Sequence, residues 1–218
     1  MSFTNLSQQQ GLAAYVAVTA AYWAFMLTDG ALRMLVLLHF HLLGFSPLQL
    51  AYLFLLYEFM GVVTNLAAGW LAARFGLAAT LYAGLSFQVV ALACLYVMPA
   101  DLEMIWAVAY VMVVQGLSGI AKDLAKMSSK SAVKVLAPDQ PGSLFRWVAV
   151  LTGSKNAVKG LGFFIGAALL ALIGFDGAVL SMGLVLFAIL LAVLAFMPSG
   201  LPTGKKEAKF TDVFSKDR

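Results

Sequence analysis

Long apolar runs, separated by short polar segments, dominate the sequence. A run of about 20 apolar residues is long enough to cross the hydrocarbon core of a bilayer as a helix. Six such runs occupy residues 12–43, 47–73, 77–98, 104 to about 124, about 145 to 173, and 178–197. Short strands of alternating polarity, which a membrane β-barrel requires, are absent from the pattern. We therefore predict an all-α, polytopic membrane protein with six transmembrane helices.

Helix-breaking residues mark the boundaries of these runs. All six prolines, at positions 47, 99, 138, 141, 198 and 202, fall at run edges or between runs, because a proline inside a helix costs roughly 3 kcal/mol. Ser46 before Pro47 predicts a helix start, with a capping hydroxyl and then a residue that needs no amide proton. We expect one bundle over residues 1–199 and a polar cytoplasmic tail over 200–218 that adds no span.

The composition supports the same class. Of 218 residues, 62% are hydrophobic and 11% charged, and the mean hydropathy is +0.93, whereas a soluble domain is about half apolar and about a quarter charged. The polar, uncharged opening and the long first run do not fit a cleaved signal peptide. The single Cys94 cannot form an internal disulfide or a thiolate metal site. We expect neither a cofactor nor a bound metal.

The basic residues predict an orientation. With both termini in the cytoplasm, Arg74, the lysines of region 122–159 and the tail lysines face inward. The outer loops then carry only acidic charges, at Asp101, Glu103 and Asp176. This distribution follows the tendency of basic residues to stay on the cytoplasmic side. We expect a multi-pass protein of the cell (inner) membrane.

Charged residues also lie inside the apolar runs, and on a helix they fall on single faces. At 100° per residue, Asp29 and Arg33 share a stripe of the first helix, Glu58 lies on a polar face of the second, and Lys155 and Lys159 share a face of the fifth. An unpaired charge at the bilayer centre costs about 2.5 to 3.5 kcal/mol, so these side chains must face one another or water. Polar faces turned inward enclose a hydrophilic cavity, which favours a transport path.

Two interpretations of these charges stay open. Asp29 and Arg33 either form an ion pair within one helix, which only fastens that helix to its neighbours, or line the path. Lys155 and Lys159 have no acidic residue one turn away, so an anionic guest or Glu58 must compensate them, unless they extend to the cytosolic interface.

A second basic series follows the fourth run. Its members recur every four residues: Lys122, Lys126, Lys130 and Lys134. This spacing predicts a basic helical stripe at the cytosolic mouth. Lys122 and Lys126 are near enough to the run to form an electrostatic entrance for anions. Lys130 and Lys134 fit an orientation signal that lies on anionic headgroups.

Three further motifs do not indicate a catalytic or metal site. Ser118 lies in a Gly-Leu-Ser-Gly motif similar to the nucleophile motif of rhomboid proteases, but the sixth run has no histidine to activate it. His39 and His41 point about 200° apart on a helix and cannot share a metal ion. Gly162 and Gly166 have the spacing of a close helix contact. We expect no enzymatic activity.

Several segments resemble one transporter superfamily. GWLAARFG, residues 69–76, is similar to the loop signature of the major facilitator superfamily, although Ala73 replaces its acidic residue and Leu77 and Ala78 replace its basic pair. LTDGALRMLVLLHFHLLGF, QGLSGIAKDLAKMSSKSAVKVL and LFRWVAVLTGSKNAVKGLGFF resemble the organoarsenical efflux permeases of the ArsJ type. Such transporters are about twice this length, with two six-helix halves. The resemblance implies an amino-terminal half.

The resemblance implies a substrate as well. It points to export of 1-arseno-3-phosphoglycerate, the ester that glyceraldehyde-3-phosphate dehydrogenase makes from arsenate, and so to arsenate resistance. This small, multiply anionic ester suits lysines and an arginine, whereas trivalent arsenic would require thiolates. We expect two sets of site residues. The anion-binding set is Arg33, Lys155, Lys159, Lys122, Lys126 and Asn156, and the counter-charge or coupling set is Asp29 and Glu58.

The expected partners are the lipid bilayer, the anionic substrate, and a second six-helix half or a second copy of this chain. Nothing in the sequence indicates a nucleic acid. Two alternatives remain. One is a major facilitator transporter of another anionic phosphorylated metabolite. The other is a non-transporting six-helix membrane module that pairs with a second half.

Overall fold

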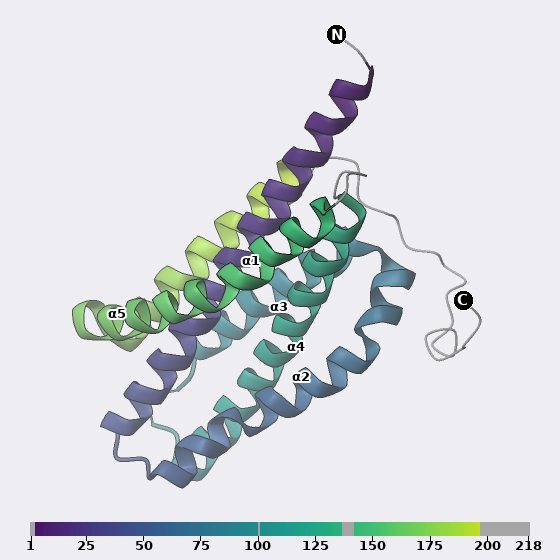
Figure 1. Cartoon of the computed structure of the whole chain (residues 1–218). Helices are drawn as coiled ribbons and strands as arrows, with labels where there is room; N and C mark the ends of the chain where they lie inside the picture. The colour runs from purple at the N-terminus through teal and green to yellow at the C-terminus, as the bar shows by residue number, and fades with distance from the viewer. Residues whose placement is uncertain (1–2, 100, 137–141, 197–218) are drawn as a thin grey trace.

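The computed structural model describes residues 3–99, 101–136 and 142–196. These residues form five helices: α1 (Phe3–Leu42), α2 (Pro47–Phe75), α3 (Leu77–Tyr96), α4 (Met104–Leu136) and α5 (Ser143–Phe196). Figure 1 shows them packed as one bundle. All five are long and apolar enough to cross a membrane. The predicted all-α class is confirmed, and the apolar helices indicate a membrane protein. The predicted tail, 200–218, lies outside the described residues.

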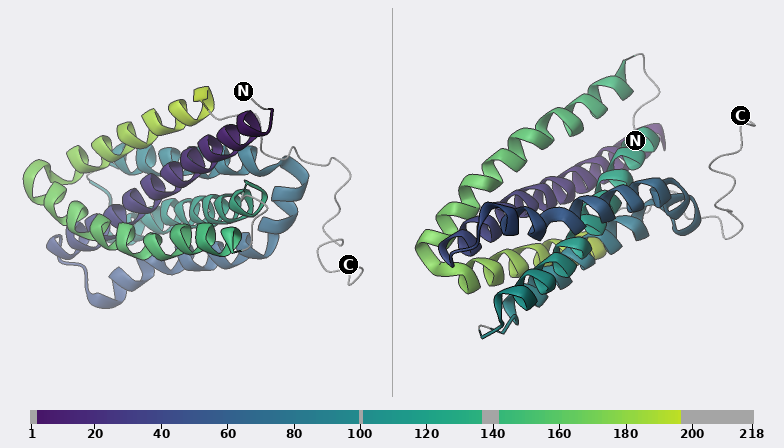
Figure 2. Two further views of the ribbon diagram at one scale, coloured as in Figure 1. Left: turned by 45° about the horizontal axis from the view of Figure 1, so that its top comes forward. Right: turned by 90° about the horizontal axis from the view of Figure 1, so that it is seen from below.

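The last helix, α5, has 54 residues and reverses its direction. The bend lies at Gly174, whose φ of 72° and ψ of −178° are not helical and are readily adopted only by glycine. The segments before and after the bend, here called the first arm (143–173) and the second arm (175–196), run in opposite directions on either side of α1 (Figures 1 and 2). The predicted fifth and sixth spans are these two arms, so five helices stand where six were expected.

The fourth helix, α4, is longer than the span predicted from its apolar run. It continues past Leu124 to Leu136 without a break, because alanine, leucine and lysine are strong helix formers and α4 contains no proline. Lys122, Lys126, Lys130 and Lys134 therefore lie on one helix, as the four-residue spacing predicted.

The start of α2 is the one that the sequence predicted. The Ser46 hydroxyl accepts a hydrogen bond from the Gln49 backbone nitrogen at 3.4 Å, and the Ser46 nitrogen donates to the Gln49 side-chain oxygen at 2.8 Å. Pro47 is the first helical residue. These two bonds satisfy donors that would otherwise lack partners at the helix end.

Glycines bring several helices into close contact. A Cβ atom added at Gly162 or Gly166 would overlap the backbone of α1 at Leu27 or Ala31. One added at Gly119 of α4 would overlap the backbone of Tyr57 in α2. The close contact predicted from the spacing of Gly162 and Gly166 is therefore confirmed. It fixes the first arm of α5 against α1, and the Gly119 contact fixes α2 against α4.

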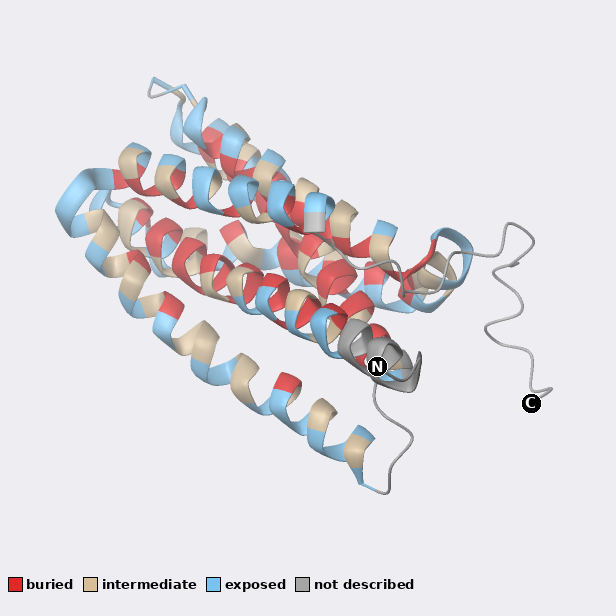
Figure 3. Cartoon of the chain, turned by 90° about the horizontal axis from the view of Figure 1, so that it is seen from above, coloured by how far each residue is buried: buried red, intermediate tan, exposed pale blue. Residues whose placement is uncertain are grey.

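Buried and exposed residues divide the bundle into an inner and an outer surface. Buried residues follow the inward sides of the helices, and exposed residues follow their outward sides (Figure 3). Helix α1 supplies more of the buried apolar residues than any other described helix, among them Tyr22, Phe25 and Leu35. Large apolar side chains such as Phe59 and Phe164 are exposed. In a membrane protein these outward apolar side chains lie where lipid surrounds the helices.

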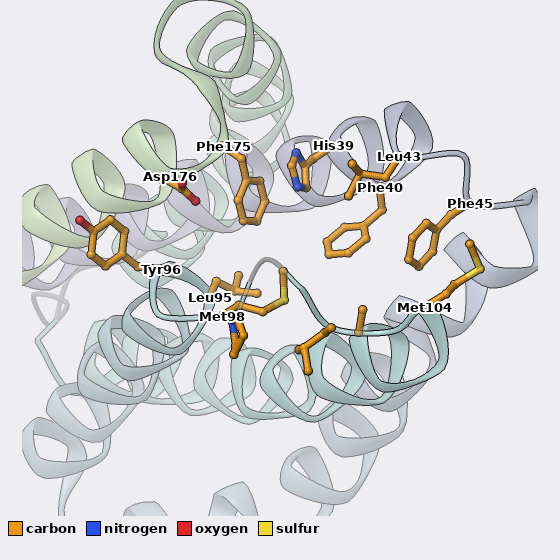
Figure 4. Close-up of a pocket in the computed structure, with 13 residues that line it drawn as sticks. His39, Phe40, Leu43, Phe45, Leu95, Tyr96, Met98, Met104, Phe175 and Asp176 are labelled. Atoms are coloured by element: carbon orange, nitrogen blue, oxygen red, sulfur yellow. The ribbon is translucent and has the colours of Figure 1, made fainter.

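The two ends of the bundle differ in charge. At one end, a pocket of about 590 Å³ lies among the ends of α1 and α3, the start of α4 and the bend of α5; His39, Tyr96 and Asp176 line it (Figure 4). The described residues of the two connections and the bend at this end include acidic residues but no lysine or arginine. The opposite end carries Arg74 at the end of α2 and Lys134 near the end of α4.

Candidate functional site

Eight charged residues within the helices define a candidate site, which we call the charged cluster. Its members come from four elements: Asp29 and Arg33 of α1, Glu58 of α2, Lys122, Asp123 and Lys126 of α4, and Lys155 and Lys159 of the first arm of α5. The other two elements differ. Helix α3 contains no charged residue, and the second arm of α5 contains only Asp176, next to the bend.

Asp29 is the most buried carboxylate of the cluster. The residue is 1% exposed. One carboxylate oxygen accepts a hydrogen bond from Lys159 Nζ at 2.6 Å, and the other accepts from the Tyr57 hydroxyl at 2.6 Å. These bonds join α1 to the first arm of α5 and to α2. They compensate a carboxylate that would be costly to bury alone.

Glu58 bridges two cations from different helices. Its Oε1 accepts a hydrogen bond from Arg33 Nη2, and its Oε2 lies 3.6 Å from Lys122 Nζ. The Glu58 side chain is 60% exposed, compared with 25% for Arg33 and 16% for Lys122. The bridge therefore places an exposed carboxylate over two largely covered cations.

Tyr57 supports both of these cations. The Arg33 guanidinium carbon lies 4.0 Å from the centroid of the Tyr57 ring, and Lys122 Nζ lies 4.3 Å from the same centroid. Cations over an aromatic face at such distances are attracted to it. Tyr57 itself is fully buried, and its hydroxyl donates to Asp29. One tyrosine thus connects the Asp29 pair with the Glu58 bridge.

Asp123 forms the third group of contacts. Its buried carboxylate accepts a hydrogen bond from Lys126 at 2.7 Å and lies 3.7 Å from Lys122 Nζ. Gly61 of α2 leaves room for this group, because a Cβ atom there would lie 2.7 Å from the Asp123 oxygen. The packing of α2 on α4 therefore depends on a residue without a side chain at Gly61.

Positive charge exceeds negative charge in the cluster. Five cations face three carboxylates, which leaves a net charge of +2. Lys155 is the member without an ion pair among the described residues, and its charge is repelled by four other lysines, at positions 122, 126, 130 and 159. Asn156, the next residue, is exposed. This surface would attract an anion.

The structure changes the partners expected for two of the charges. Asp29 and Arg33 do not pair with each other; Asp29 contacts Lys159, and Arg33 contacts Glu58. Of the two open interpretations, the ion pair within α1 is therefore wrong, since both side chains reach other helices. Lys159, for which an anionic guest or Glu58 was expected, has Asp29 instead. Asn156 has no hydrogen bond within the described part of the chain.

Sequence reasoning missed Tyr57 and Asp123. Tyr57 lies in an apolar run, where an aromatic residue usually indicates core packing, and only its position next to Glu58 was a signal. Asp123 follows Lys122 and precedes Lys126 by three residues, a spacing that allows an ion pair on one helix.

Ser118 and His39, from two of the three motifs set aside earlier, have packing contacts. Ser118 is fully buried and donates a hydrogen bond to the Gln88 side-chain oxygen at 2.5 Å, which joins α4 to α3. The His39 ring stacks on Phe175 with the ring centroids 4.0 Å apart (Figure 4). His41 is exposed.

No protein-family model matches this sequence, and no curated protein matches it. The fold and the charged cluster indicate the class. The chain is an all-α membrane protein in which charged side chains from four of its apolar elements contact one another.

Proposed function

We propose that this chain is one half of a secondary transporter of the major facilitator type, which exports the anionic organoarsenical 1-arseno-3-phosphoglycerate and so confers arsenate resistance. The observation that carries the proposal is the charge imbalance of the charged cluster, in which Lys155 has no anionic partner among the described residues. Charged residues at bilayer depth are costly and commonly mark a substrate pathway. An excess of cations favours an anionic substrate.

The distribution of charge supports one orientation of the bundle toward lipid, toward a second half and toward the cytoplasm. With both arms of α5 crossing the bilayer, the chain has six spans. The charged faces of the four elements that carry the cluster then turn toward a second half. Their outward apolar faces, together with α3 and the second arm of α5, face lipid. The end with Arg74 and Lys134 is cytoplasmic, because basic residues favour that side. Both termini are then cytoplasmic, in the inner membrane.

The cluster provides a binding mechanism. An incoming anion approaches past Lys122 and Lys126, neutralises Lys155, and competes with Asp29 and Glu58 for Lys159 and Arg33. Arginine binds phosphate-like groups through two parallel hydrogen bonds, and lysine adds a point charge. Binding between two halves near the bilayer midplane allows the site to open to either side as the halves rock.

Everted membrane vesicles, whose cytoplasmic face is outside, test this function directly. Vesicles that contain the chain together with a second six-helix half are supplied with arsenate, glyceraldehyde 3-phosphate, NAD and glyceraldehyde-3-phosphate dehydrogenase. We expect arsenic to accumulate inside, and to stop accumulating when the dehydrogenase is omitted. Accumulation that is equal without the dehydrogenase contradicts the ester as substrate.

The same vesicles distinguish the alternatives. Uptake of a labelled phosphorylated metabolite without uptake of arsenic identifies a transporter for another anion. Absence of any uptake, with the chain present alone, as a dimer or with a second half, identifies a non-transporting module. The exposure of Glu58 favours a partner surface here in either case, because an exposed carboxylate is not stable against lipid.

A further inference from the structure

Among the carboxylates of the charged cluster, Glu58 differs in exposure. The side chains of Asp29 and Asp123 are almost completely buried, whereas that of Glu58 is mostly exposed. Its two oxygens contact Arg33 and Lys122 on two different helices. An exposed anion that bridges two covered cations occupies the position that a bound anionic ligand would take.

The two cations are held in place by contacts that do not involve Glu58. Both lie over the Tyr57 ring, and the Arg33 guanidinium carbon also lies 5.7 Å from the centroid of Phe54. Tyr57 is fixed in turn by its hydrogen bond to Asp29 and by the close contact of its backbone with Gly119. The pair of cations is therefore preorganised whether or not Glu58 contacts them.

Glu58 does not saturate the donors of Arg33. The contact with Glu58 uses Nη2, while the buried Nε of Arg33 has no acceptor. A buried donor without a partner is unfavourable. A tetrahedral phosphate or arsenate group has more acceptor oxygens than a carboxylate, and the planar guanidinium can donate two parallel hydrogen bonds to it.

We propose that Arg33 and Lys122, held over Tyr57, form the subsite for the phosphate or arsenate group of the substrate, and that Glu58 occupies this subsite as an internal competitor when no substrate is bound. The inference rests on the proposed function, whose substrate it assigns to particular atoms. Arg33 and Lys122 then have an anionic partner both with and without bound substrate. Because Glu58 is exposed, its side chain can turn away when an oxyanion takes its place.

Binding of inorganic phosphate and of arsenate to the full chain in lipid nanodiscs tests the subsite. Equilibrium dialysis measures the dissociation constants of the wild type, Glu58→Gln and Glu58→Ala. If the carboxylate occupies the subsite about nine-tenths of the time, its removal tightens the apparent affinity about tenfold. Both variants should show this gain for both anions. Arg33→Lys should weaken binding at least about tenfold, because lysine cannot donate the two parallel bonds.

Glu103→Gln is the matched control. It removes the same charge from an exposed residue of the connection between α3 and α4, at the opposite end of the bundle from Arg74. A change within about twofold shows that net charge alone does not explain a gain at Glu58. Thermal unfolding of every variant identifies any that are misfolded. Because two Glu58 variants are measured, the test still works if one of them does not fold.

Equal or weaker binding in both folded Glu58 variants overturns the internal competitor, and so does the absence of binding in all variants. These results leave the vesicle assay of transport untouched. Conversely, a tenfold gain in affinity combined with no arsenic accumulation in vesicles supports the subsite and rejects export of the arsenic ester. A gain for phosphate but not arsenate assigns the subsite to the phosphate group of the ester, which supports the proposal.

Discussion

Two sides of the bundle are joined by different kinds of polar contact. On the charged side, α1, α2, α4 and the first arm of α5 are connected by ion pairs such as Asp29 with Lys159. On the neutral side, α3 is joined to α4 by hydrogen bonds between uncharged groups. Ser118 donates to Gln88, and Ser128 donates to Thr80 at 2.6 Å.

The two kinds of contact differ in whether a charged ligand can replace one of the partners. A neutral hydrogen bond in a dry interface has no charged ligand to compete for it, so it serves packing. A ligand that carries the same charge as one partner of an ion pair can displace that partner. The other partner then keeps a counter-charge, which the ligand supplies. Helix α4 belongs to both sides, with Ser118 and Ser128 facing α3 and Lys122 contacting Glu58 of α2. Stability and binding are thus divided between two faces of one helix.

The strongest test of the charged side is removal of its most buried carboxylate. Asp29→Ala should lower the free energy of unfolding by about 3 to 5 kcal/mol, because it leaves the Lys159 ammonium and the Tyr57 hydroxyl without their partner. Unfolding in mixed detergent micelles measures the change. Asp29→Ala combined with Lys159→Met should recover most of the loss, since no charge remains unpaired. A loss below about 1 kcal/mol in the single variant would contradict the importance of the pair.

The next effect concerns the close contact between α1 and α5. Gly166→Ala should reduce the free energy of unfolding by about 1 to 3 kcal/mol, because its Cβ overlaps the backbone of Ala31. Gly160→Ala on the same arm is the matched control, as no heavy atom lies within 4 Å of its added Cβ. That control should be neutral or stabilising by up to about 1 kcal/mol, since alanine favours the helix. Equal effects at the two positions would show that the overlap is unimportant.

A smaller effect is expected on the neutral side. Ser118→Ala removes one hydrogen bond to Gln88 and should cost about 0.6 kcal/mol, and at most about 1.7, as is typical between membrane helices. The same unfolding assay measures it. Arsenic accumulation in vesicles should stay within about twofold of the wild type. A loss of transport with intact stability would place the neutral side in the transport mechanism and remove the contrast between the two sides.

The smallest effect on stability should come from Lys155. Since Lys155 has no ion pair among the described residues and is repelled by other lysines, Lys155→Met should change the free energy of unfolding by less than about 0.5 kcal/mol. Vesicle transport should nevertheless fall at least about tenfold, because a charged contact with the anion is lost. Lys134→Met, which removes an exposed charge near the end of α4, should retain transport. Retained transport in Lys155→Met would remove this lysine from the binding site.

Features that depend on neighbouring residues in the chain were predictable. The start of α2 at Ser46 and Pro47 followed from capping chemistry, and the close contact at Gly162 and Gly166 followed from their spacing. The lysine stripe followed from the helical repeat. The two arms of α5 were also recognised as separate apolar runs, although only Gly174 leaves the helical conformation between them.

Features that depend on distant residues were not predictable. Asp29 and Arg33 have an ideal spacing for a pair within α1, yet each contacts a residue of another helix. Helical periodicity states which face a side chain occupies but not which helix lies opposite that face. Tyr57 was not predictable for the same reason, because Asp29, which accepts its hydrogen bond, lies 28 residues away in sequence. The contact of Asp123 with Lys126, three residues further along α4, is local and agrees with the spacing of the two residues.

The amino-acid sequence was sufficient to establish an all-helical membrane protein with charges gathered on single helix faces. A helix that crosses lipid needs an apolar run of a certain length and keeps its polar residues on one face, and both features are visible in the local sequence. The tertiary structure alone decided which charges pair, that Lys155 has no pair among the described residues, and that an exposed Glu58 bridges Arg33 and Lys122. Those outcomes depend on helix contacts between segments far apart in the chain, whose geometry no local pattern contains.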